Sequence, residues 1–133
     1  SFHGVSIKQR YPGHAVQAGT IAAQCGGSAY ASKYIVVTDE DVDVTNLEHL
    51  LWAMVMRTDP VDSIQFLKGT WDSPADAALP PDRRARGDMT HSVAIINACK
   101  PYHWRDQFPP SNTPSPETMR KAREKFGWLL EDK

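Results

Sequence analysis

Ser6 to Ala15 reads SIKQRYPGHA, and Tyr34 to Pro60 reads YIVVTDEDVDVTNLEHLLWAMVMRTDP. Each segment begins with the short, β-branched pattern of a strand and then changes to the pattern of a helix. Both changes place polar side chains at the carboxyl end of a strand, where open α/β sheets bind ligands. The two segments therefore predict the fold class and indicate the edge of the sheet at which a functional site is expected.

The rest of the chain extends this pattern to four strands. We expect strands at 4–9, 33–38, 63–68 and 92–98, with helices at 14–23, at 45–57 and from 115 onward. Small residues recur along the first helix, which allows its backbone to lie close to a sheet. The nearly continuous apolar run at 33–38 is typical of a central parallel strand covered on both faces. The predicted fold is a single α/β domain with a mainly parallel, helix-flanked sheet in the order β-α-β-α-β-loop-β.

The second helix has clear start and stop signals. Thr45 and Glu48 have the spacing of a capping box, with the threonine hydroxyl as the cap. Pro60 is expected to end the helix after Arg57. The apolar face expected between these signals comprises Leu47, Leu50, Leu51, Met54 and Val55.

Two segments lie outside the regular pattern. Residues 69–88 are rich in Pro, Ala, Asp and Arg without a period, and a loop of this length is usually functional or disordered. Residues 100–114 are dense in proline and aromatic residues and predict an extended arm. Ser115 and Pro116 then begin a carboxyl-terminal helix. We divide the domain 1–133 into a core, 4–100, and an arm with the terminal helix, 101–133. That helix has an apolar stripe of Met119, Ala122, Phe126 and Leu129.

Composition sets further bounds. A chain of 133 residues, 41% of them hydrophobic, can bury one core. A net charge of -1 gives no general attraction to phosphate backbones or anionic lipid, so neither nucleic acid nor a membrane is an expected partner. Cys25 and Cys99 lie far apart, and no signal peptide is visible, so we expect a cytoplasmic protein. Because Ser1 is no initiator and a strand pattern follows almost at once, we expect a piece of a longer chain.

Three aspartates alternate after the second strand in the manner of a calcium loop: Asp39, Asp41 and Asp43. The glycine of such a loop is replaced by Val44, and its twelfth position is Leu50 instead of glutamate. The five histidines show no metal-ligand spacing either. We therefore expect no metal here, and expect the aspartates to stabilise the positive amino end of the following helix.

Lys8 is the strongest candidate for ligand binding. It lies at the end of the first strand, shortly before the turn Tyr11-Pro12-Gly13 that leads into a helix. Its ammonium and the amides of the turn can converge on one anion. The alternative is an ordinary surface lysine on a sheet edge.

The combination of SIKQRYPGHA, a strand followed by TDEDVDV, and LLWAMVMRTDP resembles the carboxyl-terminal domain of the UbiD-type decarboxylases. These enzymes use prenylated FMN to remove or add carboxylate on aromatic and α,β-unsaturated acids. The resemblance covers most of residues 4–60 and is looser from 61 onward. In that family the lysine of the I-K-x-x-Y-P-G-H-A segment reaches the flavin phosphate, and Lys8 matches it.

The resemblance also implies what lies outside this chain. The family's catalytic Glu-Arg-Glu set belongs to the amino-terminal portion. The same portion supplies most of the flavin phosphate site. It also binds a divalent metal, either alone or together with potassium. The chain itself is thus expected to hold no catalytic residue and to be inactive alone. Its implied roles are to brace the cofactor phosphate, to close one wall of the cleft and to join protomers of a homo-oligomer. Its implied partners are its own amino-terminal flavin domain and an aromatic acid substrate.

Departures from the family limit what carries over. At 97–99 the chain has Asn-Ala-Cys where many members have Asp-Ala-Thr, so the role of that acid is not assigned here. An alignment through Pro74 makes Trp71, Ser73 and Ala75 candidates for the substrate pocket, and the small Ser73 and Ala75 imply a roomier one. An ordinary surface loop is the alternative reading of this segment.

Two other functions stay open at the level of the sequence. The chain could be a purely structural or oligomerisation module, in which Lys8 contacts no ligand. It could also be a stand-alone nucleotide-binding domain of flavodoxin-like build, which a glycine-rich phosphate loop would favour. No such loop is present.

Overall fold

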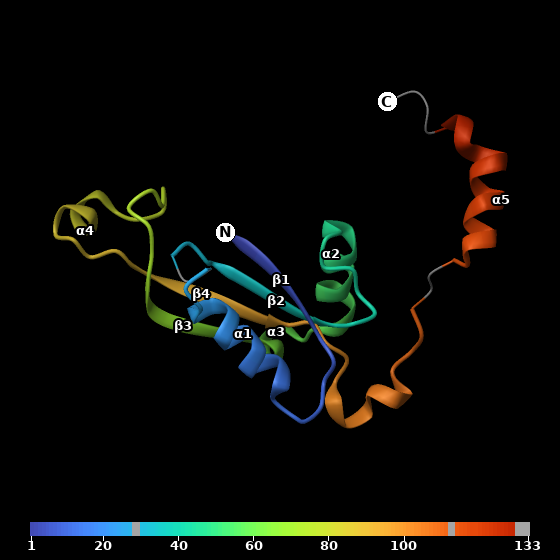
Figure 1. The fold of residues 1–133 in the computed structure, drawn as a ribbon, viewed down its shortest axis with the longest axis horizontal. Coiled ribbons are helices and arrows are strands. Elements are labelled where there is room, and N and C mark those ends of the chain that lie inside the picture. The colour runs from blue at the N-terminus through green and yellow to red at the C-terminus, as the bar shows by residue number, and fades with distance from the viewer. Residues whose placement is uncertain (28–29, 112–113, 130–133) are drawn as a thin grey trace.

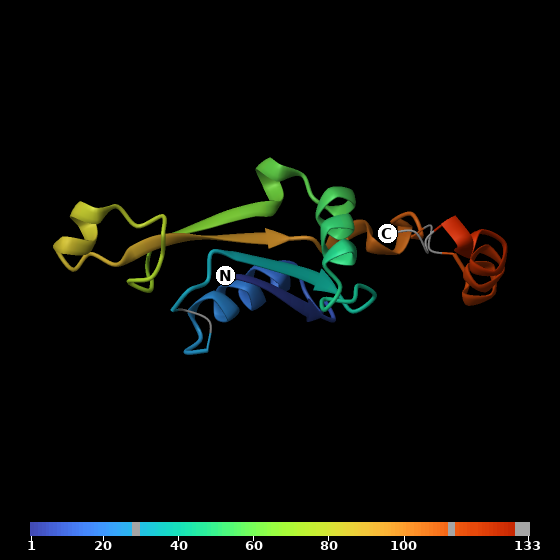
Figure 2. The same cartoon turned by 90° about the horizontal axis from the view of Figure 1, so that it is seen from above.

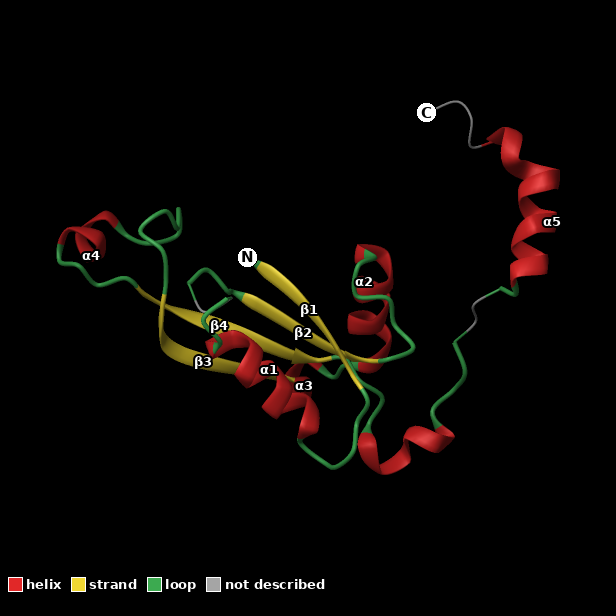
Figure 3. Cartoon of the chain, in the orientation of Figure 1, coloured by secondary structure: helices red, strands yellow, loops and turns green. Residues whose placement is uncertain are grey.

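The fold of the chain is given by a computed structural model that describes residues 1–27, 30–111 and 114–129. Four strands form one sheet, with helices on both faces and a helical arm beyond it (Figures 1 and 3). The strands are β1 (Phe2–Ile7), β2 (Tyr34–Asp39), β3 (Ile64–Trp71) and β4 (Thr90–Asn97). The helices are α1 (His14–Gln24), α2 (Leu47–Arg57), α3 (Pro60–Ser63), α4 (Pro81–Ala85) and α5 (Pro116–Phe126), with 3-10 segments η1 (Tyr102–Gln107) and η2 (Gly127–Leu129).

The predicted α/β fold class is confirmed, and the sheet is mixed. Its strand order is β1-β2-β4-β3, with β1, β2 and β4 parallel and β3 antiparallel on the outer edge. β2 is central, as expected, and its residues from Ile35 to Thr38 are fully buried. In register, Ile7 pairs with Asp39, and Val37 pairs with Asn97. The carboxyl ends of the three parallel strands therefore meet at one edge of the sheet.

Helices α1 and α2 cover opposite faces of the sheet (Figure 2). On the α1 face the buried residues include Ile35 and Val37, and on the α2 face they include Val36 and Ile96. This division follows from the alternation of side chains along a strand. α1 lies close to the sheet because its buried residues are small, namely Ala15, Gly19 and Ala23.

The predicted capping box of α2 is wrong. Asn46 is the N-cap, and its side chain accepts hydrogen bonds from the backbone amides of Glu48 and His49. The hydroxyl of Thr45 instead donates to Asp43, at 2.6 Å. Asparagine competes well for the N-cap position, and its carbonyl oxygen reaches the amides that the threonine was expected to cap.

The apolar face predicted for α2 is wrong in part. Leu50 is buried, but Leu47, Leu51 and Val55 are 58%, 49% and 77% exposed. The side that faces the sheet carries Leu50, Ala53 and Arg57 instead. α2 therefore rests on the sheet along a narrow line, with much of its apolar surface facing outward. The predicted end at Arg57 is confirmed, and Pro60 begins α3.

The long excursion between β3 and β4 is shorter than expected, because β3 continues through a bulge between Lys68 and Thr70 to Trp71. Gly69 has a φ of 71°, which only glycine adopts readily. Trp71 is thus a strand residue and not a loop residue, and α4 lies in the remaining loop.

The terminal helix lies on an arm away from the sheet, as expected (Figures 1 and 2). The side chain of Ser115 accepts from the amide of Thr118, which confirms the predicted start of α5. Met119, Phe126 and Leu129 are 42%, 48% and 58% exposed. Residues 112–113 and 130–133 of the predicted arm and helix lie outside the described residues. No helix within the described ranges has the length and apolar character needed to cross a membrane.

The close contact of α1 with the sheet gives a first test. A Cβ added at Gly19 would lie 2.4 Å from Cγ2 of Ile95 and 3.1 Å from Cγ2 of Val37. We expect Gly19→Ala to lower the free energy of unfolding by about 1–3 kcal/mol, because overpacking forces the helix away from the sheet. Urea denaturation measures this change. Gly26→Ala is the matched control, since nothing lies within 4 Å of its added Cβ. Equal stability of the two variants would contradict the described packing.

Candidate functional site

An open cleft lies at the edge where β1, β2 and β4 end. It has a volume of about 350 Å³ and is lined by residues that follow these strands, together with part of η1. Four cations and four carboxylates contribute to the cleft and its floor, so its properties depend on which of them are paired. The four cations are Lys8, Arg57, Lys100 and Arg105, and the four carboxylates are Asp39, Glu40, Asp41 and Asp106.

The floor of this edge is a buried arginine. The side chain of Arg57 is only 1% exposed, and its two terminal nitrogens donate to the two oxygens of Asp41 at 3.0 and 2.9 Å. The guanidinium also lies 3.6 Å from Asp39. It is flanked by the rings of Trp52 and Phe108, with centroids at 5.0 and 5.9 Å. Such a planar, two-pronged contact is the strongest form of arginine–carboxylate pairing.

Asp39 ties together the ends of all three parallel strands. One of its oxygens accepts from the side-chain amide of Gln9 at 2.7 Å, and the other accepts from the backbone amide of Lys100 at 2.7 Å. Gln9 also donates to the carbonyl of Lys100, at 2.9 Å. The edge is therefore held by bonds between residues that are distant in sequence.

Asp41 is the most strongly paired acid of the cleft. Besides Arg57, it accepts the ammonium of Lys100 at 2.7 Å. The hydrogen bond from Arg57 lowers the pKa of Asp41 to about 2, and the bond from Lys100 adds to the effect, against the opposing influence of burial. The expectation that Asp41 serves the amino end of α2 is therefore wrong, since a buried arginine outcompetes a helix terminus. Asp43 does bond within that local turn, through Thr45.

Lys8 and Arg105 are the loosely paired cations of the cleft. The ammonium of Lys8 lies 3.9 Å from Glu40, and its side chain is 75% exposed. Arg105 lies 3.8 Å from the exposed Asp106 and donates to the carbonyl of Gln9 at 3.1 Å. An anion entering the cleft would thus meet these two cations, whereas Arg57 and Lys100 are already engaged by Asp41.

The predicted site residues fall at two ends of the sheet. Lys8 directly follows β1 at the carboxyl edge of the parallel strands. Trp71 pairs with Thr90 at the start of β4, so Trp71, Ser73 and Ala75 lie toward the opposite edge. Trp71 is 59% exposed and packs edge-on against Tyr30, with ring centroids 4.7 Å apart. The structure does not bring these three residues together with Lys8.

The sequence interpretation missed Gln9, Arg57, Lys100 and Arg105. One signal was available for Arg57: it lies seven residues after Leu50, on the side of α2 that faces the sheet. No local signal marks Lys100 or Arg105, because their place in the cleft depends on how the chain returns after β4.

The α/β sheet and its polar carboxyl edge match a known family. Residues 2–98 match the model of the 3-octaprenyl-4-hydroxybenzoate carboxy-lyase C-terminal domain. The chain belongs to this family, that of the UbiD-type decarboxylases. An uncharacterized protein from Archaeoglobus fulgidus is 36% identical over 110 residues, which cover 80% of this chain and 21% of the relative.

Solved structures show the same fold. The apo structure of a 3,4-dihydroxybenzoic acid decarboxylase from Enterobacter cloacae is similar with a TM-score of 0.72 and 27% identity, over 94% of this chain and 26% of that one. The UbiD-class enzyme HmfF from Pelotomaculum thermopropionicum, in complex with FMN, has a TM-score of 0.69 and 20% identity, over 86% of this chain and 24% of that one. The chain thus spans about a quarter of the length of these relatives.

The pairing of Asp41 predicts a pH-dependent loss of stability. Its pKa falls on folding from 3.8 to about 2, so its contribution is fully present above about pH 4 and is lost as the pH drops through 2. We expect Asp41→Asn to lower the free energy of unfolding by about 1–3 kcal/mol at neutral pH, a range that allows for partial solvent exposure of the carboxylate.

Denaturant unfolding of both proteins between pH 7 and pH 2 measures this effect. The gap between wild type and Asp41→Asn should narrow as the pH approaches 2. Asp106→Asn is the control, because that side chain is 96% exposed. A gap that stays constant down to pH 2 would show that the charge of Asp41 does not stabilise the fold.

Proposed function

We propose that this chain braces the phosphate of a prenylated FMN cofactor in a reversible, non-oxidative decarboxylase. The substrate class is aromatic or α,β-unsaturated carboxylic acids. The single observation that carries the proposal is the state of Lys8, an exposed ammonium with only a 3.9 Å contact to an acid, at the carboxyl edge of a UbiD-type sheet. A lysine binds phosphate as a point charge, and this one is available to do so.

The donor set of the edge fits a phosphate better than a metal. Lys8 and Arg105 offer cationic donors to the cleft. The carboxylates of Asp39 and Asp41, which a divalent ion would need, are already bonded to Arg57, Lys100 and Gln9. We therefore expect other parts of the enzyme to hold the divalent metal, either alone or together with potassium.

The residues of this chain would orient the cofactor and leave the chemistry to other groups. When bound, prenylated FMN supplies an electrophilic ring that takes up the electrons of the departing carbon dioxide. Lys8 fixes the phosphate end, and the network under Asp39 keeps the strand ends rigid beneath it. We assign no proton-donor role to the side chains at this edge. The chain alone is therefore expected to be inactive.

The relatives support the substrate class. One similar structure is a decarboxylase of 3,4-dihydroxybenzoic acid, an aromatic acid, and another was solved in complex with FMN. The proposed pocket residues Trp71, Ser73 and Ala75 lie away from Lys8. Any contact they make with substrate would therefore be independent of the phosphate site.

Lys8→Ala in the full-length enzyme tests the phosphate role. We expect about 10-fold weaker FMN binding, equivalent to about 1.4 kcal/mol, with an unchanged unfolding midpoint. Titration followed by flavin fluorescence measures the affinity. Lys68→Ala is the matched control, since Lys68 is an exposed lysine on β3. Lys8→Arg should retain most of the affinity. Unchanged FMN affinity in Lys8→Ala would reject the role.

We further propose that α5 joins neighbouring protomers of a homo-oligomer. The helix stands away from its own sheet (Figure 1). Phe126 of its apolar stripe is 48% exposed, and Trp128 of the adjoining η2 is 66% exposed. An isolated helix of this length has little stability in water, so a partner surface is expected. These features also support the alternative of a purely structural module.

The double variant Phe126→Glu with Trp128→Glu tests this role of α5. We expect the oligomer to shift toward the monomer in light scattering, because two charges would be buried in the contact. The control is Lys121→Glu, which changes a solvent-exposed residue of the same helix. Retention of the original mass by the double variant would refute the proposed contact.

A further inference from the structure

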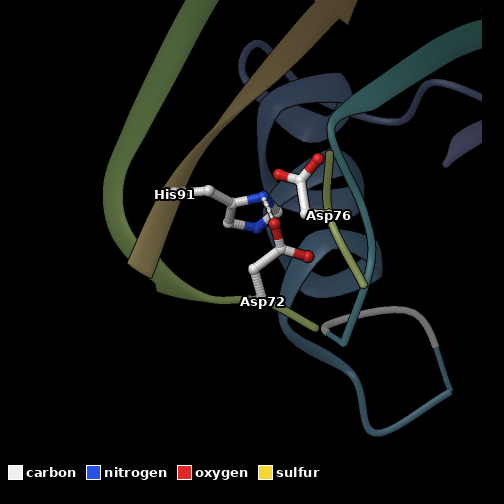
Figure 4. A group of neighbouring side chains, drawn as sticks. All are labelled: Asp72, Asp76 and His91. Atoms are coloured by element: carbon white, nitrogen blue, oxygen red, sulfur yellow. Dashed lines mark ion pairs between the residues drawn. The ribbon is translucent and has the colours of Figure 1, made fainter. Parts of the chain in front are cut away.

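A second polar cluster lies at the end of the sheet opposite Lys8, where β3 ends and β4 begins. Asp72 directly follows β3, Asp76 lies in the next turn, and His91 is the second residue of β4 (Figure 4). One ligand atom from each of the three lies within 4.8 Å of the other two. The antiparallel pairing of β3 with β4 brings them together, and the backbone amide of Asp72 donates to the carbonyl of Met89 at 2.8 Å.

The cluster is buried and its polar atoms are not satisfied. The side chains of Asp72 and His91 are 2% and 8% exposed. Nδ1 of His91 lies 3.1 Å from Oδ2 of Asp72, yet the two atoms form no hydrogen bond. Among the described residues, these two atoms and Nε2 of His91 have no hydrogen-bond partner. Buried polar atoms of this kind are nearly always hydrogen-bonded or bound to an ion.

Both carboxylates are held in place by other contacts. Oδ1 of Asp72 accepts from the backbone amide of Ser73 at 2.7 Å. Oδ1 of Asp76 accepts from the amide of Ala78 at 3.0 Å and from the ammonium of Lys33. Oδ2 of Asp72 has no hydrogen-bond partner, and the side chains of Asp72 and Asp76 lie close enough to interact with each other.

We propose that Asp72, Asp76 and His91 bind one divalent cation, with Zn²⁺ as the favoured ion. One imidazole nitrogen with two carboxylate oxygens suits Zn²⁺, whereas calcium and magnesium prefer oxygen alone. Ligand atoms held at about 2.0–2.2 Å from one tetrahedral ion lie about 3.5 Å apart, so the cluster needs to contract by only about 1 Å. A water molecule completes the shell.

Access and charge are both compatible with an ion. A cavity of about 390 Å³ is lined by Lys33, Asp76 and His91 and provides a path from solvent. The two carboxylates outnumber the Lys33 ammonium, and Arg83, which also lines the cavity, is paired with Asp88. Because Lys33 is 29% exposed along its side chain, its ammonium can turn toward solvent as the ion enters.

The ion would fix the loop that leaves β3. Asp72 and Asp76 bracket the segment that contains Ser73 and Ala75, and His91 ties this segment to β4. Because Lys8 is at the other edge of the sheet, the site does not depend on the proposed cofactor role of this chain.

Zinc binding by the full-length protein tests the proposal. The protein is stripped with a chelator, titrated with Zn²⁺ and analysed for bound zinc by plasma mass spectrometry after gel filtration. We expect Asp76→Asn and His91→Gln each to remove one equivalent, with a loss of affinity of about 100-fold or more, since even partners behind the ligands are worth 10–100-fold. His103→Gln is the control, because His103 is an exposed histidine of η1.

A metal site elsewhere in the full-length protein would bind zinc equally in all variants. It would therefore not affect the difference in zinc content between the wild type and the variants. If His91→Gln does not fold, the proposal is tested with Asp76→Asn and with the zinc K-edge absorption spectrum of the wild type. That spectrum should contain one imidazole nitrogen among oxygens. Equal zinc content in wild type and Asp76→Asn would overturn the proposal and leave Asp72 and His91 as a buried polar contact without an ion.

Discussion

The buried guanidinium of Arg57 organises the carboxyl edge of the sheet. It engages both oxygens of Asp41 and lies near Asp39, which in turn bonds to residues that follow β1 and β4. An arginine with a side chain that is 1% exposed is costly to bury unless its charge is compensated. Asp39 and Asp41 provide that compensation, whereas Asp43 bonds to Thr45 in the turn before α2.

This assignment of charges decides what the edge can bind. Once Arg57 and Lys100 are engaged by Asp41, the loosely paired cations of the cleft are Lys8 and Arg105. Their contacts with acids, at 3.9 and 3.8 Å, are long and exposed, and such surface pairs contribute little energy. A phosphate can therefore displace them at small cost. In the proposed function, the floor holds the strand ends in place and the exposed Lys8 contacts the phosphate.

Much of the fold could be predicted from local patterns. The apolar run of β2, the small residues of α1 and the Ser115 cap of α5 each have a physical cause within a few residues. The predicted face of α2 was wrong because α2 is apolar on more than one side, so its period does not say which side meets the sheet. Asn46 and Thr45 are both good caps, and sequence alone does not decide between them.

The sites were less predictable than the fold. The position of Lys8 followed from one strand and one turn, so its place at the carboxyl edge was foreseen. Arg105 and Lys100 enter the cleft only through the return of the chain after β4. Asp72, Asp76 and His91 meet only because β3 pairs with β4 in one register, shifted by a bulge at Gly69. The sequence spacing of these three residues matches no metal-binding motif, so the spacing of the histidines alone does not predict that they meet.

The proposed contact between Lys8 and the cofactor phosphate can be measured directly. A crystal structure of the full-length enzyme with FMN bound measures the distance from Nζ of Lys8 to the nearest phosphate oxygen. We expect a distance of about 2.7–3.2 Å, with the ammonium turned from Glu40 toward the phosphate. A bound flavin whose phosphate lies beyond the reach of Lys8, with the ammonium still beside Glu40, would contradict it.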